Sequence, residues 1–329
     1  MNICMTAAYD GSRFAGWQKN KNTGKKRALQ DIFEQMLSDY FGQAVKVTAA
    51  GRTDAGVNAL GQVLNFHVRN TERAVRAVAQ TGSGGTRTEQ GMPRETEPEI
   101  LRRPEQALLR ELNNALPAAL ESGERGAVAI RSLRIVGERF HSRFDAVGKT
   151  YLYLIDEGER PCVFTRSFTF AAGGPLDISV MQEAAAILTG THDFRAFTSL
   201  AERADADCDT VRTITGLSVR RVPAGLHRTP LLCIAVTGNG FLYHMARILA
   251  GTLYEIGTGK RSAESAAELL RPGARRSDAG ALLPGEALFL KEVFYRGPDS
   301  SREPSASGRT NRLPPGQTAP VREVQSALP

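Results

Sequence analysis

The sequence predicts an α+β fold of two similar halves, each with a mainly antiparallel sheet backed by helices. Two observations predict it. Short apolar runs of strand character alternate with longer segments that repeat apolar residues at helical spacing. The same order of strands and helices then recurs in the second half of the chain, although no internal sequence repeat is evident. The length of 329 residues is also that of two ordinary domains.

The first half is expected to begin with a strand and to set two amphipathic helices among further strands. Apolar residues from Leu29 to Tyr40 fall at i, i+3, i+4, i+7, i+8 and i+11, which is one face of a helix. A second helix can open at Pro104, and Pro117 is expected to end it. The expected strands cover residues 3–9, 45–50, 62–68 and 127–136.

The second half is expected to repeat this alternation of strands and helices. Asp177 is placed to cap a helix that ends before Gly190, because Asp favours the N-cap position and Gly the C-terminal end. Two more helices are expected over residues 241–256 and 262–270. The expected strands cover residues 151–155, 164–170, 211–221, 231–237 and 287–295.

Two segments differ in composition from the rest of the chain. Residues 80–99 contain no aromatic residue and one large apolar residue, Met92, so they cannot bury enough apolar surface to offset their ordering entropy. We expect a flexible insertion there. Residues 297–329 hold six of the 16 prolines and no Phe, Tyr or Trp, which favours a disordered tail. The two α+β halves are therefore expected to span 1–139 and 140–296.

Composition and charge narrow the class of protein. The net charge of +7 permits a polyanionic partner without requiring one. No apolar run reaches the roughly 18 residues of a membrane span, and the N-terminus lacks the features of a signal peptide, so we expect a cytoplasmic protein. The four cysteines form no C-x-x-C pair, and the chain has no P-loop or G-x-G-x-x-G motif, which disfavours a zinc knuckle or a nucleotide cofactor.

One loop carries residues suited to chemistry. Residues 51–57 read GRTDAGV and lie between two expected strands. The two glycines allow a tight turn, which can present the Asp54 carboxylate into a cleft while the loop stays rigid. An aspartate in such a turn can equally serve only to cap backbone amides. The pattern alone leaves both interpretations open.

This loop, with ALGQV at 59–63, resembles the signature of the tRNA pseudouridine synthase A family. The resemblance extends from the first strand to the last and leaves out the insertion and the tail. Further motifs follow in the family's order: YDG at 9–11, GWQ at 16–18, LNNALP at 112–117, FHSRF at 140–144, KTYLY at 149–153, HDF at 192–194, TVRTI at 210–214 and GNGFLYHMAR at 238–247.

The resemblance implies an isomerase, an intramolecular transferase that converts uridine to pseudouridine in tRNA. In such enzymes the N-glycosidic bond breaks, the uracil turns, and a carbon–carbon bond to the same sugar forms. The resemblance further implies uridines 38, 39 and 40 of the tRNA anticodon stem and loop as substrates, with no cofactor and no metal. It also implies a homodimer in which the two halves of each chain form one platform with a central RNA-binding cleft.

The resemblance assigns roles to four residues of this chain. Asp54 matches the catalytic nucleophile, Arg247 the arginine that pairs with it, and Tyr151 the tyrosine that packs on the target uracil. Arg52 is expected to support the site, at a phosphate or in the gap that a flipped base leaves. Taken without the resemblance, Arg247 could be solvated, Tyr151 a core residue and Arg52 a structural partner of Asp54. Whether Asp54 attacks the sugar, attacks the base or removes a sugar proton stays open.

One departure and two further motif residues bear on the site. Asn58 stands where the family commonly has histidine, and an amide cannot titrate near neutral pH. His141 and Arg143 are expected to contact the RNA backbone or to order their loop. Three other functions remain possible: a synthase acting on another RNA or tRNA position, a non-catalytic RNA-binding protein, and a carbohydrate hydrolase, which would need a second carboxylate.

Overall fold

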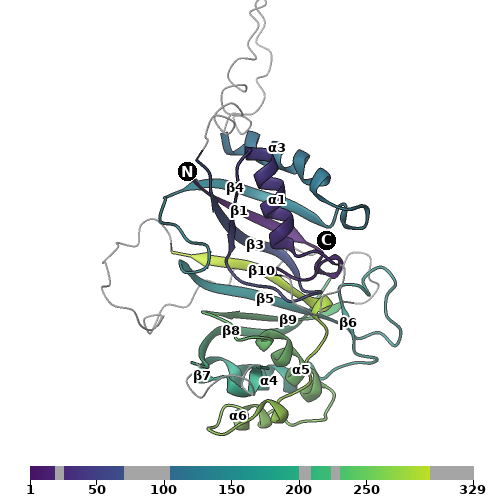
Figure 1. The fold of residues 1–329 in the computed structure, drawn as a ribbon. Coiled ribbons are helices and arrows are strands. Elements are labelled where there is room, and N and C mark those ends of the chain that lie inside the picture. The colour runs from purple at the N-terminus through teal and green to yellow at the C-terminus, as the bar shows by residue number, and fades with distance from the viewer. Residues whose placement is uncertain (19–25, 70–103, 200–208, 224–229, 297–329) are drawn as a thin grey trace, which may run out of the picture. The chain divides into compact units, whose positions relative to one another are not determined.

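The computed structural model of the chain describes residues 1–18, 26–69, 104–199, 209–223 and 230–296 (Figure 1). The predicted insertion and the predicted tail lie outside these residues. The chain divides into two compact units, Met1–Ala146 and Val147–Pro329. The described strands pair mainly antiparallel and are accompanied by few helices, which confirms the predicted α+β class.

Four antiparallel strands form the sheet of the first unit. β1 lies between β3 and β4, and β2 pairs with β3. Met5 of β1 is opposite Leu64 of β3 on one side and Leu133 of β4 on the other, and all three side chains are buried. This row of apolar side chains therefore belongs to the core. The strands are β1 (Asn2–Tyr9), β2 (Val47–Ala49), β3 (Asn58–His67) and β4 (Val128–Val136).

Two helices, α1 (Leu29–Phe41) and α3 (Pro104–Ala119), contact each other, and α3 also contacts β4 (Figure 1). The predicted apolar face of α1 is buried except at Tyr40, which is partly exposed, and the helix ends at Gly42, whose φ of 65° suits glycine. The predicted end of the second helix at Pro117 is wrong, because α3 continues for two more residues. Proline removes one helical hydrogen bond and disturbs the preceding turn, so the helix stops within one turn instead of at the ring itself.

The second unit is built around β5. The order of neighbouring strands is β10, β5, β9, β8 and β7, and β6 pairs parallel with β5. The pairs of β9 with β5 and β8, and of β8 with β7, are antiparallel. The strands are β5 (Ala146–Asp156), β6 (Phe170–Ala171), β7 (Gly190–Asp193), β8 (Val211–Val222), β9 (Leu231–Gly238) and β10 (Leu288–Tyr295).

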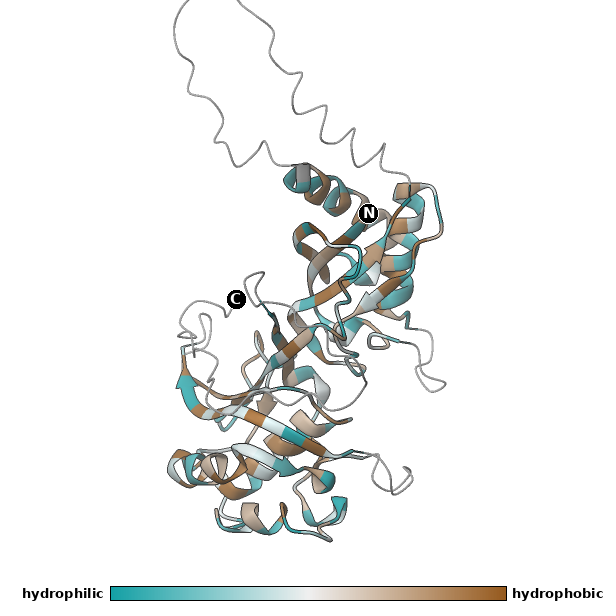
Figure 2. Ribbon diagram, turned by 90° about the vertical axis from the view of Figure 1, so that its left-hand side faces the viewer, coloured by the Kyte–Doolittle hydropathy of each residue, from teal (hydrophilic) through white to brown (hydrophobic). Residues whose placement is uncertain are grey.

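Three α-helices belong to the second unit: α4 (Ile178–Leu188), α5 (Met245–Gly257) and α6 (Ser265–Glu268). Asp177 caps α4 as predicted, since its carboxylate accepts the backbone N–H of Ser179 at 2.9 Å. α4 contacts β8, α5 and α6. Apolar and polar residues alternate along these elements (Figure 2), as amphipathic helices and half-buried strands require.

The predicted strand over 164–170 is wrong, because only Phe170 lies in a strand. Most of this segment belongs to a loop that follows β5. The buried carboxylate of Asp156 accepts the backbone N–H of Gly158 at 2.9 Å and of Cys162 at 3.0 Å, which turns the chain out of the sheet. Phe164 is then 71% exposed. An apolar run predicted a strand here, but its residues are not buried.

The predicted helix over 241–256 begins four residues late, at Met245. His244 precedes it with a φ of 66°, which no residue of a right-handed helix adopts. The helix expected over 262–270 is shorter than predicted and covers only α6. β7, which follows α4 directly, was not predicted, since its four residues are too few to show a period.

Candidate active site

The loop from residue 50 to residue 57 joins β2 to β3 in the first unit. It closes as a turn in which the Val57 N–H donates to the Asp54 carbonyl at 3.1 Å, and Gly56 adopts a φ of 85°. Burial alternates along the loop: Thr53 is buried, Arg52 is exposed, and Asp54 is partly exposed. The loop is therefore held by Thr53 and presents Arg52 and Asp54 outward.

A buried group of polar side chains holds the loop from one side. The Tyr9 hydroxyl lies 2.9 Å from Thr53 Oγ1 and accepts an N–H from Gln62 Nε2 at 3.3 Å. The same Gln62 nitrogen donates to the Gly51 carbonyl at 2.8 Å. Burial raises the pKa of Tyr9 to about 12, so the hydroxyl stays protonated at any physiological pH. Sequence reasoning missed these contacts, because Tyr9 and Gln62 lie on two different strands.

The turn at Gly16 holds the loop from a second side. The Trp17 N–H donates to the Thr53 carbonyl at 2.9 Å. Gly16 has a φ of 90°, and a Cβ there would lie 2.8 Å from the Thr53 carbonyl oxygen and from the Ala55 nitrogen. Only glycine fits this approach. Trp17 is buried and stacks on Phe33 at a centroid distance of 5.9 Å, so its role is packing.

Asn58 holds the loop from a third side. Its side chain is 1% exposed, and its Oδ1 accepts the Gly11 N–H at 2.9 Å. Gly11 begins the short 3-10 helix Gly11–Arg13 and lies against Val57 so closely that a Cβ would come within 2.0 Å of the Val57 carbonyl oxygen. The amide thus fastens the Gly11 turn to the end of the Asp54 loop. This bond needs an acceptor and no titratable group, which explains how asparagine serves at this position.

In the second unit, Tyr151 lies in β5 and is 8% exposed. Its ring meets that of Phe241 edge-to-face, with centroids 4.9 Å apart and planes at 76°. Phe241 lies between β9 and α5, in the predicted motif over 238–247. Two residues along β5, Tyr153 is 1% exposed and donates its hydroxyl to the Pro284 carbonyl at 3.0 Å. Burial raises the pKa of Tyr153, and this residue belongs to the core.

Arg247 lies in the first turn of α5. Its Nε donates to the Leu283 carbonyl at 2.7 Å, next to the Pro284 carbonyl that Tyr153 binds. Both side chains therefore fasten the segment that leads into β10.

A strained residue stands at the start of α5. His244, with its φ of 66°, is the one non-glycine residue in the described ranges with a positive φ. Its Nδ1 lies 2.9 Å from the Ser199 hydroxyl, and its ring stacks on Tyr243 with centroids 3.6 Å apart. Tyr243 is 41% exposed. Backbone strain of this kind is typical of functional sites and costs about 1–3 kcal/mol. Histidine is one of the residues enriched at positive φ, but most histidines adopt other conformations, so the sequence alone does not predict this backbone.

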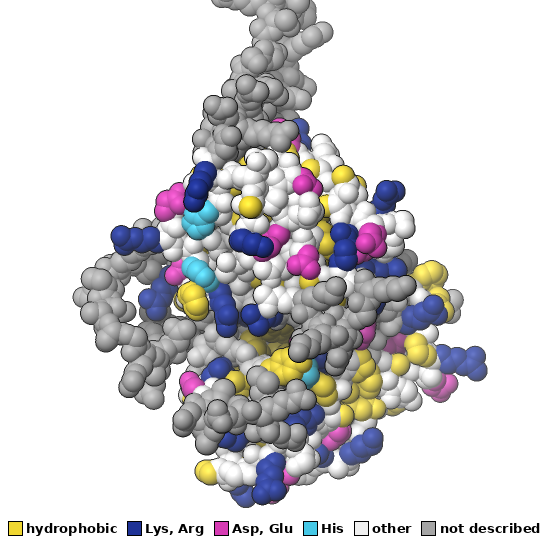
Figure 3. All heavy atoms as spheres, in the orientation of Figure 1, with side chains coloured by type: hydrophobic (Ala, Val, Ile, Leu, Met, Phe, Trp, Pro, Cys, Tyr) yellow, Lys and Arg dark blue, Asp and Glu magenta, His cyan; other side chains and the backbone are white. Residues whose placement is uncertain are grey.

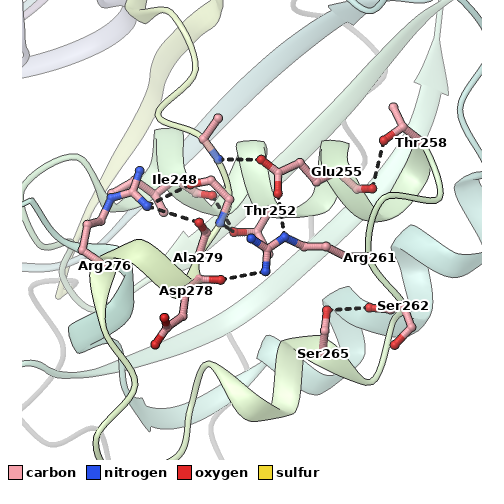
Figure 4. Close-up of polar contacts among 12 residues, drawn as sticks. Ile248, Thr252, Glu255, Thr258, Arg261, Ser262, Ser265, Arg276, Asp278 and Ala279 are labelled. Atoms are coloured by element: carbon pink, nitrogen blue, oxygen red, sulfur yellow. Dashed lines mark hydrogen bonds and ion pairs between the residues drawn. The ribbon is translucent and has the colours of Figure 1, made fainter.

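The far end of α5 is fixed by a polar network (Figure 4). Glu255 accepts the Arg261 Nε–H at 2.6 Å and the Ala281 N–H at 2.9 Å. One turn earlier, Thr252 Oγ1 accepts the Gly280 N–H at 3.0 Å. A Cβ at Gly251 would lie 1.9 Å from the Ala281 carbonyl oxygen, so the chain presses directly on the helix. The network sets the position of α5 and hence that of Arg247.

The four predicted site residues thus fall into two pairs. Arg52 and Asp54 share the loop of the first unit, whereas Tyr151 and Arg247 lie in the second unit. The meeting of Asp54 with Tyr151 and Arg247 stays a prediction. Among the described residues, no group of three or more His, Cys, Asp or Glu side chains could hold a metal ion. No helix in the described ranges is long and apolar enough to cross a membrane.

Comparison with models of protein families shows the class of protein to which the chain belongs. The model of the tRNA pseudouridine synthase family matches residues 5–104 and 184–296, which include the Asp54 loop and α5. The chain therefore belongs to the tRNA pseudouridine synthase family.

Curated relatives point to one kind of member within this family. Proteins named tRNA pseudouridine synthase A from Acetivibrio thermocellus, Halalkalibacterium halodurans and Shouchella clausii are similar to the chain. They are 33%, 35% and 36% identical to it over 294, 288 and 292 residues. The matches cover 89%, 87% and 88% of this chain and 99%, 90% and 92% of the relatives. The predicted resemblance is thereby confirmed.

Proposed function

We propose that the chain is a tRNA pseudouridine synthase that isomerises uridine at positions 38, 39 and 40 of the anticodon stem and loop. The support is the relatives named tRNA pseudouridine synthase A, which match over almost the whole chain. The observation that carries the proposal is the loop over 50–57. It is braced from three sides, yet it leaves Arg52 exposed and Asp54 partly exposed to a substrate. We further propose a cytoplasmic homodimer that needs neither cofactor nor metal.

Asp54 is the proposed nucleophile. Its carboxylate is partly exposed, and a carboxylate can form a covalent bond to a sugar or a base during catalysis. It must be ionised to attack, so a cation beside it would favour the reactive form. Three groups of contacts hold its loop. A nucleophile that is already held in its reactive position loses less entropy on reaching the transition state. Attack on the sugar, attack on the base and removal of a sugar proton are all compatible with this position.

Arg247 is the proposed partner of the Asp54 carboxylate. Its Nε–H is already used by the Leu283 carbonyl, which fixes the guanidinium in the first turn of α5. The terminal N–H groups of an arginine can bind a carboxylate bidentately. We propose that the halves over 1–139 and 140–296 form a platform whose central cleft brings these two side chains together.

Tyr151 is proposed to pack on the target uracil, and Arg52 to hold the extruded nucleotide. The edge-to-face contact with Phe241 fixes the plane of the Tyr151 ring, which suits it to receive a base. The target base must first leave its stack, at a cost of a few kcal/mol. The exposed guanidinium of Arg52, two residues from Asp54, can offset part of this cost through a phosphate contact.

Pseudouridine mapping at nucleotide resolution tests the proposal. Purified protein is incubated with unmodified tRNA transcripts, without added metal beyond the Mg²⁺ that folds the RNA. We expect pseudouridine at positions 38, 39 and 40. Pseudouridine only at other positions would move the substrate while keeping the reaction. Tight tRNA binding with no pseudouridine anywhere would contradict the proposal and favour a non-catalytic RNA-binding protein.

A further inference from the structure

Phe144 is the most exposed large hydrophobic side chain in the described part of the chain. It lies in the turn over 140–145, between β4 and β5, and is 72% exposed. Its ring packs against that of His141, with centroids 4.2 Å apart and the planes tilted by 30°. The Arg143 guanidinium carbon lies 5.9 Å from the centre of the Phe144 ring. An aromatic ring, an imidazole and a guanidinium thus share one solvent-facing turn.

The turn has a defined conformation, because His141 closes it. Nδ1 of His141 accepts the backbone N–H groups of Arg143 and Phe144, each at 3.2 Å. The His141 carbonyl accepts the Asp145 N–H at 3.0 Å, and the Asp145 carboxylate accepts the His141 N–H at 2.9 Å. Since Nδ1 accepts hydrogen bonds, the neutral ring carries its proton on Nε2. These bonds fix the His141 ring on which Phe144 rests.

The base of the turn is anchored in the core of the first unit. Ser142 is fully buried; its N–H donates to Asn65 Oδ1 at 2.9 Å and its hydroxyl to the Thr48 carbonyl at 2.6 Å. Asn2, also fully buried, donates to the Phe140 carbonyl at 2.8 Å and accepts from Asn65 at 3.0 Å. A buried polar network of this kind rigidifies what it holds. Phe144 is therefore held outward by the fold.

The surroundings of the turn are cationic. Three exposed arginines lie in or beside it: Arg134, Arg139 and Arg143. Two acids lie nearby as well, Glu138, which pairs with the N-terminal ammonium at 3.1 Å, and Asp145, but the cationic groups outnumber them. More widely, the face of the molecule drawn in Figure 3 carries arginine and lysine side chains among apolar and acidic ones. This charge attracts a polyanion.

We propose that the turn over 140–145 is a stacking platform for an unpaired nucleobase of the RNA, with Phe144 under the base and Arg143 at a neighbouring phosphate. The inference rests on the proposed function, which supplies the RNA. A single exposed ring is too small to hold a protein partner, because stable protein interfaces bury roughly 800 Å² on each side. It is the size that one base needs, and such stacking changes affinity by about five- to 150-fold per base.

A pair of tryptophan variants tests the stack directly. Trp17 is the natural tryptophan and is 2% exposed. The fluorescence of a tryptophan introduced at the surface can therefore be distinguished from that of Trp17. Phe144→Trp is compared with Phe164→Trp, whose parent residue is equally exposed, at 71%, in the loop after β5. An unmodified anticodon-arm transcript should quench the added fluorescence of Phe144→Trp with saturation and leave that of Phe164→Trp nearly unchanged. Equal quenching in both, or in neither, would overturn the proposal.

Alanine and leucine variants measure the contribution to binding. Phe144→Ala should weaken binding of the transcript at least about fivefold, whereas Phe164→Ala should stay within about twofold. Phe144→Leu keeps an apolar side chain but should still lose most of the affinity that stacking on the aromatic ring contributes. Arg143→Ala should instead lower the salt dependence of binding by about one unit of slope, as the loss of one phosphate contact does. Affinities and slopes equal to wild type in the Phe144 and Arg143 variants would contradict the platform.

The outcomes separate this inference from the proposed function. If the wild-type protein forms pseudouridine and the Phe144 variants bind like wild type, only the platform is wrong. If the wild-type protein forms none, the proposed function is wrong, and the fluorescence pair still decides whether RNA stacks on Phe144. A blue-shifted, dilution-dependent emission of Phe144→Trp without RNA would show that a second copy covers the ring, and it would also overturn the platform.

Discussion

Tyr9 illustrates, at the scale of single residues, how a side chain without any catalytic role can determine the active loop. Its hydroxyl joins Thr53 of the loop to Gln62 of β3 in a buried position. We expect Tyr9→Phe to lower the free energy of unfolding by about 1–3 kcal/mol, because two buried polar groups lose a partner. Turnover should fall as well, since the loop loses one of its three supports. Urea denaturation and initial rates measure the two effects.

Tyr40→Phe is the matched control for this prediction. Tyr40 is only partly buried and donates its hydroxyl to Glu111 of α3, which is not among the groups that hold the loop. Loss of the Tyr40 hydroxyl should lower the free energy of unfolding by less than about 1 kcal/mol. The partly exposed Glu111 carboxylate can accept a hydrogen bond from water instead. A stability and rate in Tyr9→Phe that match those of Tyr40→Phe would contradict the support that we assign to Tyr9.

The buried Tyr9 hydroxyl should make the stability of the folded protein depend on pH. Burial raises the pKa of Tyr9 to about 12 in the folded protein, from about 10 in the unfolded chain. The folded state therefore holds this proton more tightly, and the resulting stability is complete below pH 10 and is lost as the pH rises through 12. Other buried groups with raised pKa values, Tyr153 and Cys233, titrate in the alkaline range too. The difference between wild type and Tyr9→Phe isolates the contribution of Tyr9, and no difference above pH 10 would contradict it.

At the scale of elements, the turn at Gly16 carries the sharpest steric constraint on the loop. Gly16→Ala introduces a Cβ at 2.8 Å from two backbone atoms of the loop, in addition to a positive φ. Gly173 has a similar φ of 75° but nothing within 4 Å of its Cβ position. Gly173→Ala should therefore lower the free energy of unfolding only by the roughly 1–2 kcal/mol that a positive φ costs a residue with a Cβ. Gly16→Ala should lower it by clearly more, because of the added steric clash. Thermal melting compares the two, and equal losses would mean that the loop moves aside freely.

Hydrophobic periodicity and capping residues predicted several elements correctly. Contacts between distant segments explain where these predictions failed. The face of α1 and the cap at Asp177 are local features, so they could be predicted from the sequence. The loop that carries Phe164 departs from its predicted strand because of hydrogen bonds to Asp156, eight residues earlier. The late start of α5 depends on the backbone of His244. Likewise, the bond from Asn58 to Gly11 spans 47 residues, which no local pattern reveals.

At the scale of the whole molecule, the central expectation is that Asp54 of the first unit pairs with Arg247 of the second. A double-mutant cycle on stability tests it without needing an active enzyme. If Asp54→Asn and Arg247→Met remove one shared interaction, their effects on the free energy of unfolding should be non-additive by about 0.5–3 kcal/mol. A cycle of Asp54→Asn with Arg221→Met is the control. Arg221 pairs with Glu157 at 2.8 Å and takes no part in the contacts that position Arg247, so this second cycle should be additive. Additivity in both cycles would contradict the pairing.

The sequence predicted the family and the four site residues from ordered motifs. The family is confirmed over most of the chain by the matched model and the relatives. The supports of the loop could not be predicted, because Tyr9, Gly16 and Asn58 act through the backbone of other segments. The residue roles and the assembly of the site remain predictions.

The role of Asp54 as the nucleophile is tested most directly by the activity of Asp54→Asn on tRNA, measured together with its tRNA binding. Asp39→Asn, an exposed acid on α1, serves as the matched control. We expect Asp54→Asn to form no pseudouridine and to bind tRNA within about threefold of wild type, a difference of less than about 1 kcal/mol. Asp39→Asn should be indistinguishable from wild type. Pseudouridine formation by Asp54→Asn at more than a few per cent of the wild-type rate would contradict the account.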